Sequence, residues 1–113
     1  MQFSPDQMKN AANSAESLLK AFANANRLMI LCQLMDGEKS VSEIAQAVPI
    51  TKSALSQHLA RLRSAHLVQT RREGLTIFYV LEGEVPERVV RLFFDLYCAN
   101  DAELPTFGKA GSL

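Results

Sequence analysis

The sequence has no long apolar run, and no stretch approaches the roughly 18 consecutive apolar residues that indicate a membrane-spanning helix. Its beginning, Met1 to Asn10, also lacks the basic start and apolar core of a secretory signal. These two absences argue against a membrane partner and against export. We therefore expect a cytoplasmic protein.

Cysteine is scarce: the two cysteines, Cys32 and Cys98, stand 66 residues apart. They form no close-spaced pair of the kind that binds structural zinc, and a reducing compartment disfavours a permanent disulfide between them. The chain also lacks a recognisable nucleophile–base pair, acid–base pair or phosphate-binding loop. We therefore expect neither an enzyme nor a bound cofactor.

The chain has no net charge, because its 12 basic residues balance its 12 acidic ones. The charges are nevertheless unevenly distributed. Residues 51–74 contain five basic residues and one acidic residue, a net +4, whereas the remainder has seven and eleven, a net −4. A basic stretch within a neutral protein is typical of a nucleic-acid-binding surface.

Helical periodicity occupies most of the chain, whose 113 residues suffice for one domain. Four helices are predicted before residue 66. They span residues 8–25, 27–35, 41–48 and 52–65. Ser40, with Glu43 three positions later, has the spacing of a capping box, and Thr51 is the expected cap of the fourth helix. Pro49 ends the third helix, so the third and fourth form a helix-turn-helix.

Two β-rich segments follow, residues 67–72 and 76–81, with a hairpin turn expected at Glu73-Gly74. A last helix is expected from Pro86 to about Asn100. The predicted fold class is mainly α with a two-stranded β-hairpin wing, a winged helix-turn-helix. Residues 8–100 form the DNA-binding and dimerisation domain in this interpretation, and residues 101–113 form a flexible tail.

The last helix is apolar on more than one face, which is more than a helix lying on a single core requires. We expect the surplus to form a dimer interface shared with the first helix. The predicted assembly is therefore a homodimer.

The helix after Thr51 is the expected reader of DNA, because its outer face carries small and polar side chains that fit the major groove. Gln57 can pair with adenine, and Ser53 and Ser56 can bond to bases or phosphates. Cationic and hairpin residues are assigned to the DNA backbone or minor groove: Lys52, Arg61, Arg71, Arg72 and Thr76. The partner is double-stranded operator DNA.

The two histidines receive structural interpretations. His58 lies one turn from Ala54 and from Leu62 and is expected to be packed. His66, at the junction between helix and strand, is expected to be a cap or a phosphate contact. A solvated helix and a charged hairpin would explain the charge pattern alone, but the order helix–turn–helix–hairpin favours DNA binding.

Several stretches together resemble the ArsR/SmtB family of bacterial repressors. They are Ala23 to Leu28, Val41 to Ala45, Ser53 to Leu62, Leu67-Val68 and Phe78-Tyr79. The resemblance covers about residues 15–100. It implies a homodimer joined by its first and last helices, a recognition helix in the major groove, and release of DNA upon induction.

Many members of that family sense metals, yet both common metal sites are absent here. The helix 41–48 contains no cysteine, and the last helix offers carboxylates without histidine. Soft transition metals prefer thiolate and imidazole ligands. A metal site built from Cys32 and Cys98 alone would be under-coordinated, so we expect no metal.

The surroundings of Cys32 and Cys98 resemble the SqrR, BigR and HlyU branch of the family, whose members respond to sulfane sulfur or oxidants. The resemblance implies a repressor that senses reactive sulfur species or oxidants, and that releases DNA when the two thiols form a disulfide or polysulfide bridge. Persulfides or polysulfides would be its inducers. From spacing alone, two buried core cysteines are favoured instead. An anti-repressor or activator of the same fold, and a metal-sensing repressor with a non-standard site, remain alternatives.

Overall fold

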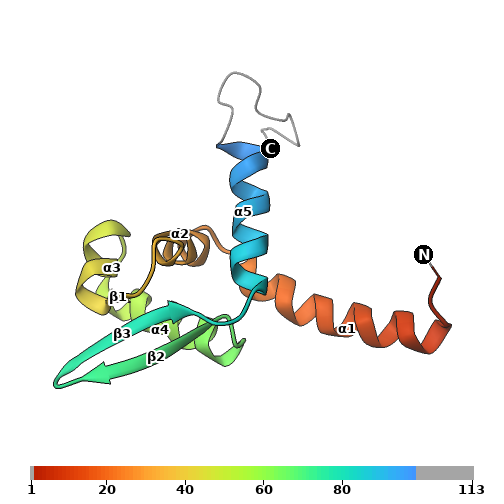
Figure 1. Cartoon of the computed structure of the whole chain (residues 1–113), viewed down its shortest axis with the longest axis horizontal. Coiled ribbons are helices and arrows are strands. Elements are labelled where there is room, and N and C mark those ends of the chain that lie inside the picture. Colours follow the sequence, from red (N-terminus) through yellow and green to blue (C-terminus); the bar gives the residue numbers. More distant parts are fainter. Residues whose placement is uncertain (1, 99–113) are drawn as a thin grey trace.

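The computed structural model describes residues 2–98, and the order of its elements is that of a winged helix-turn-helix (Figure 1). The elements are α1 (Pro5–Phe22), α2 (Ala25–Leu34), β1 (Lys39–Ser40), α3 (Val41–Ala47), α4 (Lys52–Ser64), β2 (Val68–Glu73), β3 (Thr76–Leu81) and α5 (Val85–Tyr97). The predicted fold class is confirmed. Asn100 and the predicted tail lie outside the described residues.

The first helix begins three residues earlier than predicted, and it also ends three residues earlier. Ser4 accepts a hydrogen bond from the backbone N–H of Gln7, whose side chain bonds back to the Ser4 N–H. This capping box, with Pro5 in the first turn, starts α1 ahead of the predicted first residue of the helix, Met8. Asn24 caps α2 through Arg27 N–H at 3.0 Å, which separates the two helices.

The helix-turn-helix forms as predicted, with Ser40 and Glu43 making the capping box of α3 and Thr51 capping α4. The far end of α4 is closed by His66, which adopts φ +60°. Leu67 N–H bonds to Leu62 O and His66 N–H to Arg63 O, the paired bonds of a Schellman motif. The expectation that His66 is a cap is therefore confirmed.

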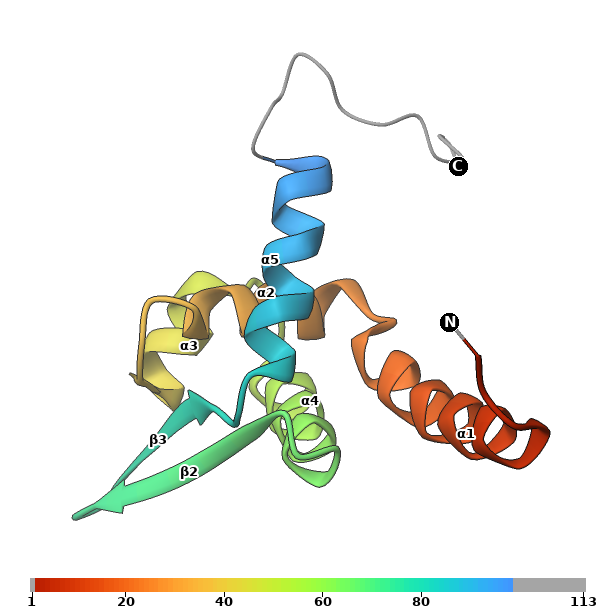
Figure 2. The same cartoon turned by 45° about the vertical axis from the view of Figure 1, so that its right-hand side comes forward.

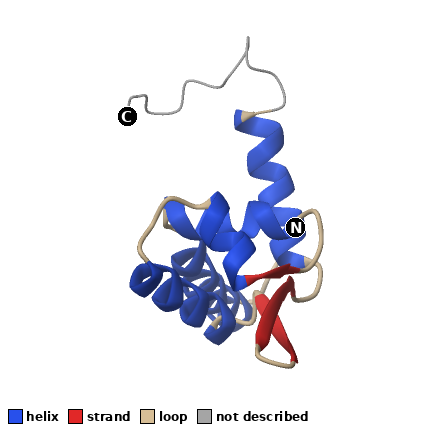
Figure 3. Cartoon of the chain, turned by 90° about the vertical axis from the view of Figure 1, so that its left-hand side faces the viewer, coloured by secondary structure: helices blue, strands red, loops and turns tan. Residues whose placement is uncertain are grey.

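The wing contains a third strand that was not predicted. The sheet order is β1-β3-β2, with Lys39 opposite Tyr79. Figure 3 shows the strands of the wing in red. Two residues are too short to show an alternating pattern, which explains the omission. The predicted turn is also displaced by one residue: Glu73 pairs with Thr76, so Gly74 and Leu75 form the loop. Gly74 has φ +63°, a conformation that glycine adopts without steric penalty.

The core lies where α2, α3 and α4 meet the base of the wing. Its fully buried side chains include Ile30, Leu31, Ile44, Leu55, Leu62 and Val68. Each helix contributes from one face, so the packing sets the rotation of α4 about its axis. The polar face of α4 consequently points away from the core.

Two helices extend beyond this core (Figures 1 and 2). In α1 the buried residues are Ala21 and Phe22, both in its last turn, while Met8 and Leu19 are more than half exposed. In α5, Val90 is buried, whereas Leu92 and Phe94 are more than half exposed. Within residues 2–98, no helix is both long and apolar enough to span a bilayer.

Two leucines should respond oppositely to truncation. Leu62 is completely buried and Leu75 is 94% exposed. Leu62→Ala should lower the free energy of unfolding by about 2–5 kcal/mol, because it removes buried methyl groups and leaves a cavity. Leu75→Ala should change it by less than about 0.5 kcal/mol. Urea unfolding followed by circular dichroism, at one protein concentration, measures both values, and equal losses would contradict this placement of the core.

Candidate DNA-binding surface and thiol pair

The outer face of α4 is small and polar, as the sequence predicts. Leu55, Leu59 and Leu62 are buried on one side of this helix. The predicted DNA-contacting residues Lys52, Ser53, Ser56, Gln57 and Arg61 are all exposed. The first turn of α4 can therefore approach the base edges without a bulky side chain in the way.

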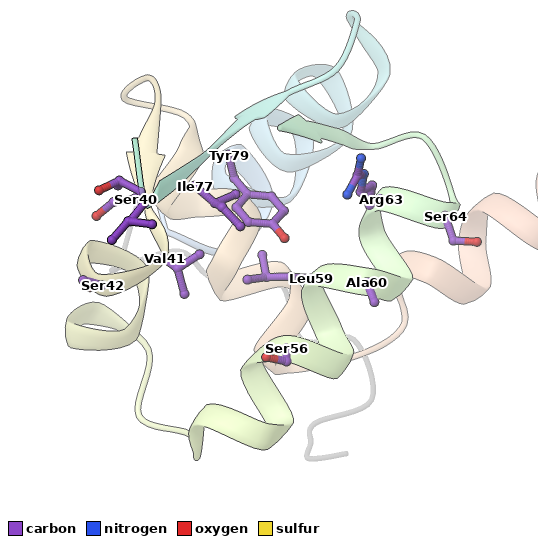
Figure 4. A pocket seen from close by; sticks show the side chains of 12 residues that line it. Ser40, Val41, Ser42, Ser56, Leu59, Ala60, Arg63, Ser64, Ile77 and Tyr79 are labelled. Atoms are coloured by element: carbon purple, nitrogen blue, oxygen red, sulfur yellow. The ribbon is translucent and has the colours of Figure 1, made fainter. Parts of the chain in front are cut away.

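An open groove of about 840 Å³ separates α4 from the wing (Figure 4). Its walls come from α3, α4 and β3 and include Ser42, Ser56, Arg63, Ser64, Thr76 and Ile77. Hydroxyl groups and one guanidinium along an open groove suit a sugar–phosphate backbone. Arg63 was not assigned a role from the sequence, where its only signal was its place in the basic stretch.

The wing arginine Arg71 is engaged by acidic side chains. Its Nε and Nη2 atoms donate to the two carboxylate oxygens of Glu38, at 2.9 and 2.7 Å, and Glu73 lies 3.7 Å from Nη1. The guanidinium also stacks over the ring of Phe78, 4.5 Å from its centroid. The hydrogen bond from Arg71 lowers the pKa of Glu38, while that bond raises the pKa of Arg71.

Arg71 and Arg72 are neighbours in sequence but lie on opposite faces of the wing, because side chains alternate along a strand. Arg71 is opposite Phe78, and Arg72 is opposite Ile77. Since Ile77 lines the groove, the register places Arg72 on the groove side. Arg72 is exposed, and its Nε donates to Gly74 O at 3.2 Å.

His58 is half-buried in α4, consistent with the expectation that it is packed. Its Nδ1 atom lies 3.4 Å from Nη1 of Arg27 in α2. Burial, followed by the positive charge of Arg61, lowers the pKa of Arg27. The middle of the recognition helix is thus in contact with a cation from α2.

Both cysteines are exposed free thiols, so the alternative of two buried core cysteines is wrong. Cys32 lies on α2, and Cys98 caps the end of α5. These helices pack against each other, and the pKa of Cys32 is raised by partial burial and then by the nearby Cys98. The fold therefore brings together two residues that the sequence separates by 66 positions.

Metal ligands are not grouped in the same way. Across residues 2–98, no three His, Cys, Asp or Glu side chains are arranged to hold a metal ion. Cys32 and Cys98 accordingly stand as a pair of thiols without a third ligand of these types among the described residues.

The winged helix with a polar recognition helix defines a class of DNA-binding proteins, and comparisons identify the family. Residues 24–70 match the family described as "Bacterial regulatory protein, arsR family". The chain is 46% identical to "Transcriptional activator HlyU" of Vibrio cholerae, over 81% of this chain and 85% of the relative. It is 36% identical to "Biofilm growth-associated repressor" of Xylella fastidiosa, over 87% of this chain and 86% of the relative.

Solved structures agree with this assignment. The structure described as "Reduced HlyU" from V. cholerae aligns with 81% of this chain and with 97% of its own chain. The TM-score is 0.77 and the sequence identity is 46%. A homodimeric winged helix-turn-helix DNA-binding domain from Mycobacterium bovis aligns with 82% of this chain and with 86% of its own chain. The TM-score is 0.70 and the sequence identity is 34%. The chain belongs to the arsR family. It is a DNA-binding transcriptional regulator, and the family is not one of enzymes.

Removing the charge of Glu38 should release Arg71 for DNA. Glu38→Gln should strengthen binding to non-specific duplex DNA, and the slope of log affinity against log salt concentration should steepen by about one. Fluorescence anisotropy at several salt concentrations measures both quantities. Glu87→Gln is the matched control, because it removes the same charge from the pair with Arg91 on α5. Equal changes in both variants would contradict a specific role for Glu38.

The raised pKa of Cys32 should appear in its reactivity. Because only the thiolate is nucleophilic, Cys32 should react with iodoacetamide more slowly at pH 7 than in the urea-unfolded chain, and the difference should shrink as pH rises. Cys98→Ser should move the rate profile of Cys32 to lower pH, since it removes a neighbouring negative charge. Peptide mass spectrometry follows the alkylation, and a profile unchanged by Cys98→Ser would contradict the coupling.

Proposed function

We propose that this regulator is a homodimer that binds operator DNA with Cys32 and Cys98 as thiols and leaves it when reactive sulfur species or oxidants join them. The main support is the pairing of two exposed thiols across α2 and α5. The V. cholerae relative whose structure is described as reduced lends further support.

The dimer interface proposed here consists of the exposed apolar faces of α1 and α5. Met8, Leu19, Leu92 and Phe94 are each about half exposed or more in the single chain. Large exposed apolar side chains on two projecting helices are typical of surfaces that a partner covers. The homodimeric domain from M. bovis has the same fold and supports this assembly.

The DNA contacts proposed here follow from α4 and the groove beside it. Gln57, Ser53 and Ser56 read base edges from the first turns of α4, and Lys52 and Arg61 contact phosphates. Arg72 and Thr76 approach the backbone from the wing. Arg71 joins them when a phosphate competes with Glu38 for its guanidinium.

The thiol chemistry proposed here begins at Cys98, because the raised pKa of Cys32 leaves less of it as thiolate. The Cys98 thiolate attacks a sulfane sulfur of an inorganic polysulfide, whose S–S bond breaks and whose shorter fragment departs with the electron pair. Cys32 then attacks the Cys98 sulfur of the resulting persulfide and expels hydrosulfide, leaving a disulfide. Attack further along a bound polysulfide chain leaves a bridge with inserted sulfur.

The bridge would transmit a signal because it joins two elements with different roles. α2 packs against α1, α3 and α4 as well as α5. A covalent link between α2 and α5 changes their relative position and with it the separation of the two recognition helices. Dimeric regulators of this type need half-sites about 34 Å apart, one turn of DNA.

A second candidate is activation instead of repression, since the V. cholerae relative is named an activator and the X. fastidiosa relative a repressor. An activator of this kind displaces another silencing protein from the same DNA. A promoter fusion in cells with and without the regulator separates the two: repression predicts higher expression in its absence, and activation predicts lower expression.

Treatment with an inorganic polysulfide should weaken binding to a duplex selected by the reduced protein from a random library. We expect at least a tenfold loss of affinity, about 1.4 kcal/mol, reversed by dithiothreitol. Cys32→Ser and Cys98→Ser should bind the same duplex but lose the response. Mass spectrometry of the treated protein distinguishes a disulfide from a bridge with inserted sulfur. Unchanged affinity in the wild type, or an equal response in Cys32→Ser, would refute the sensing proposal.

A further inference from the structure

One arginine, Arg27, connects the projecting helix α1 to the rest of the protein. Its Nε atom donates to Ala21 O at 2.7 Å, and its Nη2 atom donates to Lys20 O at 3.0 Å. Both carbonyls lie in the last turn of α1, where backbone acceptors lack the i+4 N–H partners of the helix interior, and Lys20 O also accepts from the N–H of Ala23 at 3.3 Å. A cation at this end also complements the helix dipole.

The third nitrogen of the same guanidinium, Nη1, contacts the recognition helix α4. Nη1 of Arg27 lies 3.4 Å from Nδ1 of His58 in α4. Because arginine only donates, Nδ1 is the acceptor in this contact, which corresponds to the His58 tautomer with its proton on Nε2. One planar group, anchored in α2, thus contacts both α1 and α4.

The connection matters because, within one chain, α1 is held near its last turn, where Leu18 also packs against the core. Its buried side chains, Ala21 and Phe22, belong to the same last turn that Arg27 contacts. An 18-residue helix is about 27 Å long, so a rotation of about 10° at this end would move the other end by about 5 Å. One base pair of DNA rises about 3.4 Å.

We infer that Arg27 is a positioning residue that holds α1 at a fixed angle to α4 and thereby sets the spacing of DNA half-sites the dimer accepts. The inference rests on the proposed dimerisation through α1 and α5. Arg27 itself contacts no DNA in this scheme. Its guanidinium sets where one recognition helix lies relative to the other.

The test uses duplexes that the wild-type protein selects from a random library, re-synthesised with one base pair inserted or deleted between the half-sites. The wild type should lose about tenfold or more in affinity on either change, because each moves one recognition helix out of register. Arg27→Lys keeps the charge but not the fork. The Arg27→Lys variant should remain a dimer by sedimentation. Its DNA affinity should fall by less than about threefold when one base pair is inserted or deleted between the half-sites.

Two substitutions at His58 examine the α4 side of the connection without touching the bonds to Lys20 and Ala21. His58→Gln keeps an acceptor and should keep the sharp spacing dependence, whereas His58→Leu should flatten it. The control Arg91→Lys makes the same exchange on the polar face of α5 and should behave as wild type.

Each outcome bears on one claim. If Arg27→Lys retains the wild-type contrast between spacings, or weakens binding equally at every spacing, the positioning role is refuted. If Arg27→Lys fails to fold, the same two outcomes measured with His58→Leu refute the positioning role. If the wild type selects no paired half-sites, the proposed dimeric DNA binding fails instead, before any variant is considered.

Discussion

The packing of α2 in the middle of the helical body is the constraint on which the other features depend. Ile30, Leu31 and Leu34 are buried, and the helix contacts α1, α3, α4 and α5. Burial of this apolar side leaves two functional side chains at the helix surface. Arg27 reaches α1 and α4, while Cys32 lies near Cys98 on α5.

Electrostatics within the wing modify what the charge pattern suggests. The basic stretch counts Arg71 as a free cation, but two carboxylates surround it, and the bidentate bond to Glu38 has the geometry of the strong arginine–carboxylate pairs. Only Glu73 of the two lies in that stretch; Glu38 comes from the segment before β1. Arg63 and Arg72, on the groove side, therefore matter more to the local potential than their position in the sequence indicates.

Periodicity and caps predicted most of the helical frame, because an apolar stripe and a polar N-cap are local signals. α3 and α4 begin at the predicted residues for this reason. Features that depend on partners distant in the sequence could not be predicted from these local signals. β1 exists only through β3, Arg71 differs from Arg72 through the pleat and Glu38, and the exposure of Cys32 depends on which side of α2 faces the core. An apolar neighbourhood in sequence does not reveal that side.

The roles proposed for Arg27 and Cys32 in α2 also provide a way for a thiol bridge to act over a distance. Cys32 comes five positions after Arg27, which corresponds to about 7.5 Å along the helix and about 140° around it. The two side chains therefore leave α2 in different directions, one toward α1 and α4 and the other toward α5. A displacement of α2 imposed at Cys32 moves Arg27 with it, because a helix three turns long behaves as a rigid rod. In the proposed mechanism, the redox signal and the half-site geometry share α2 as one mechanical element.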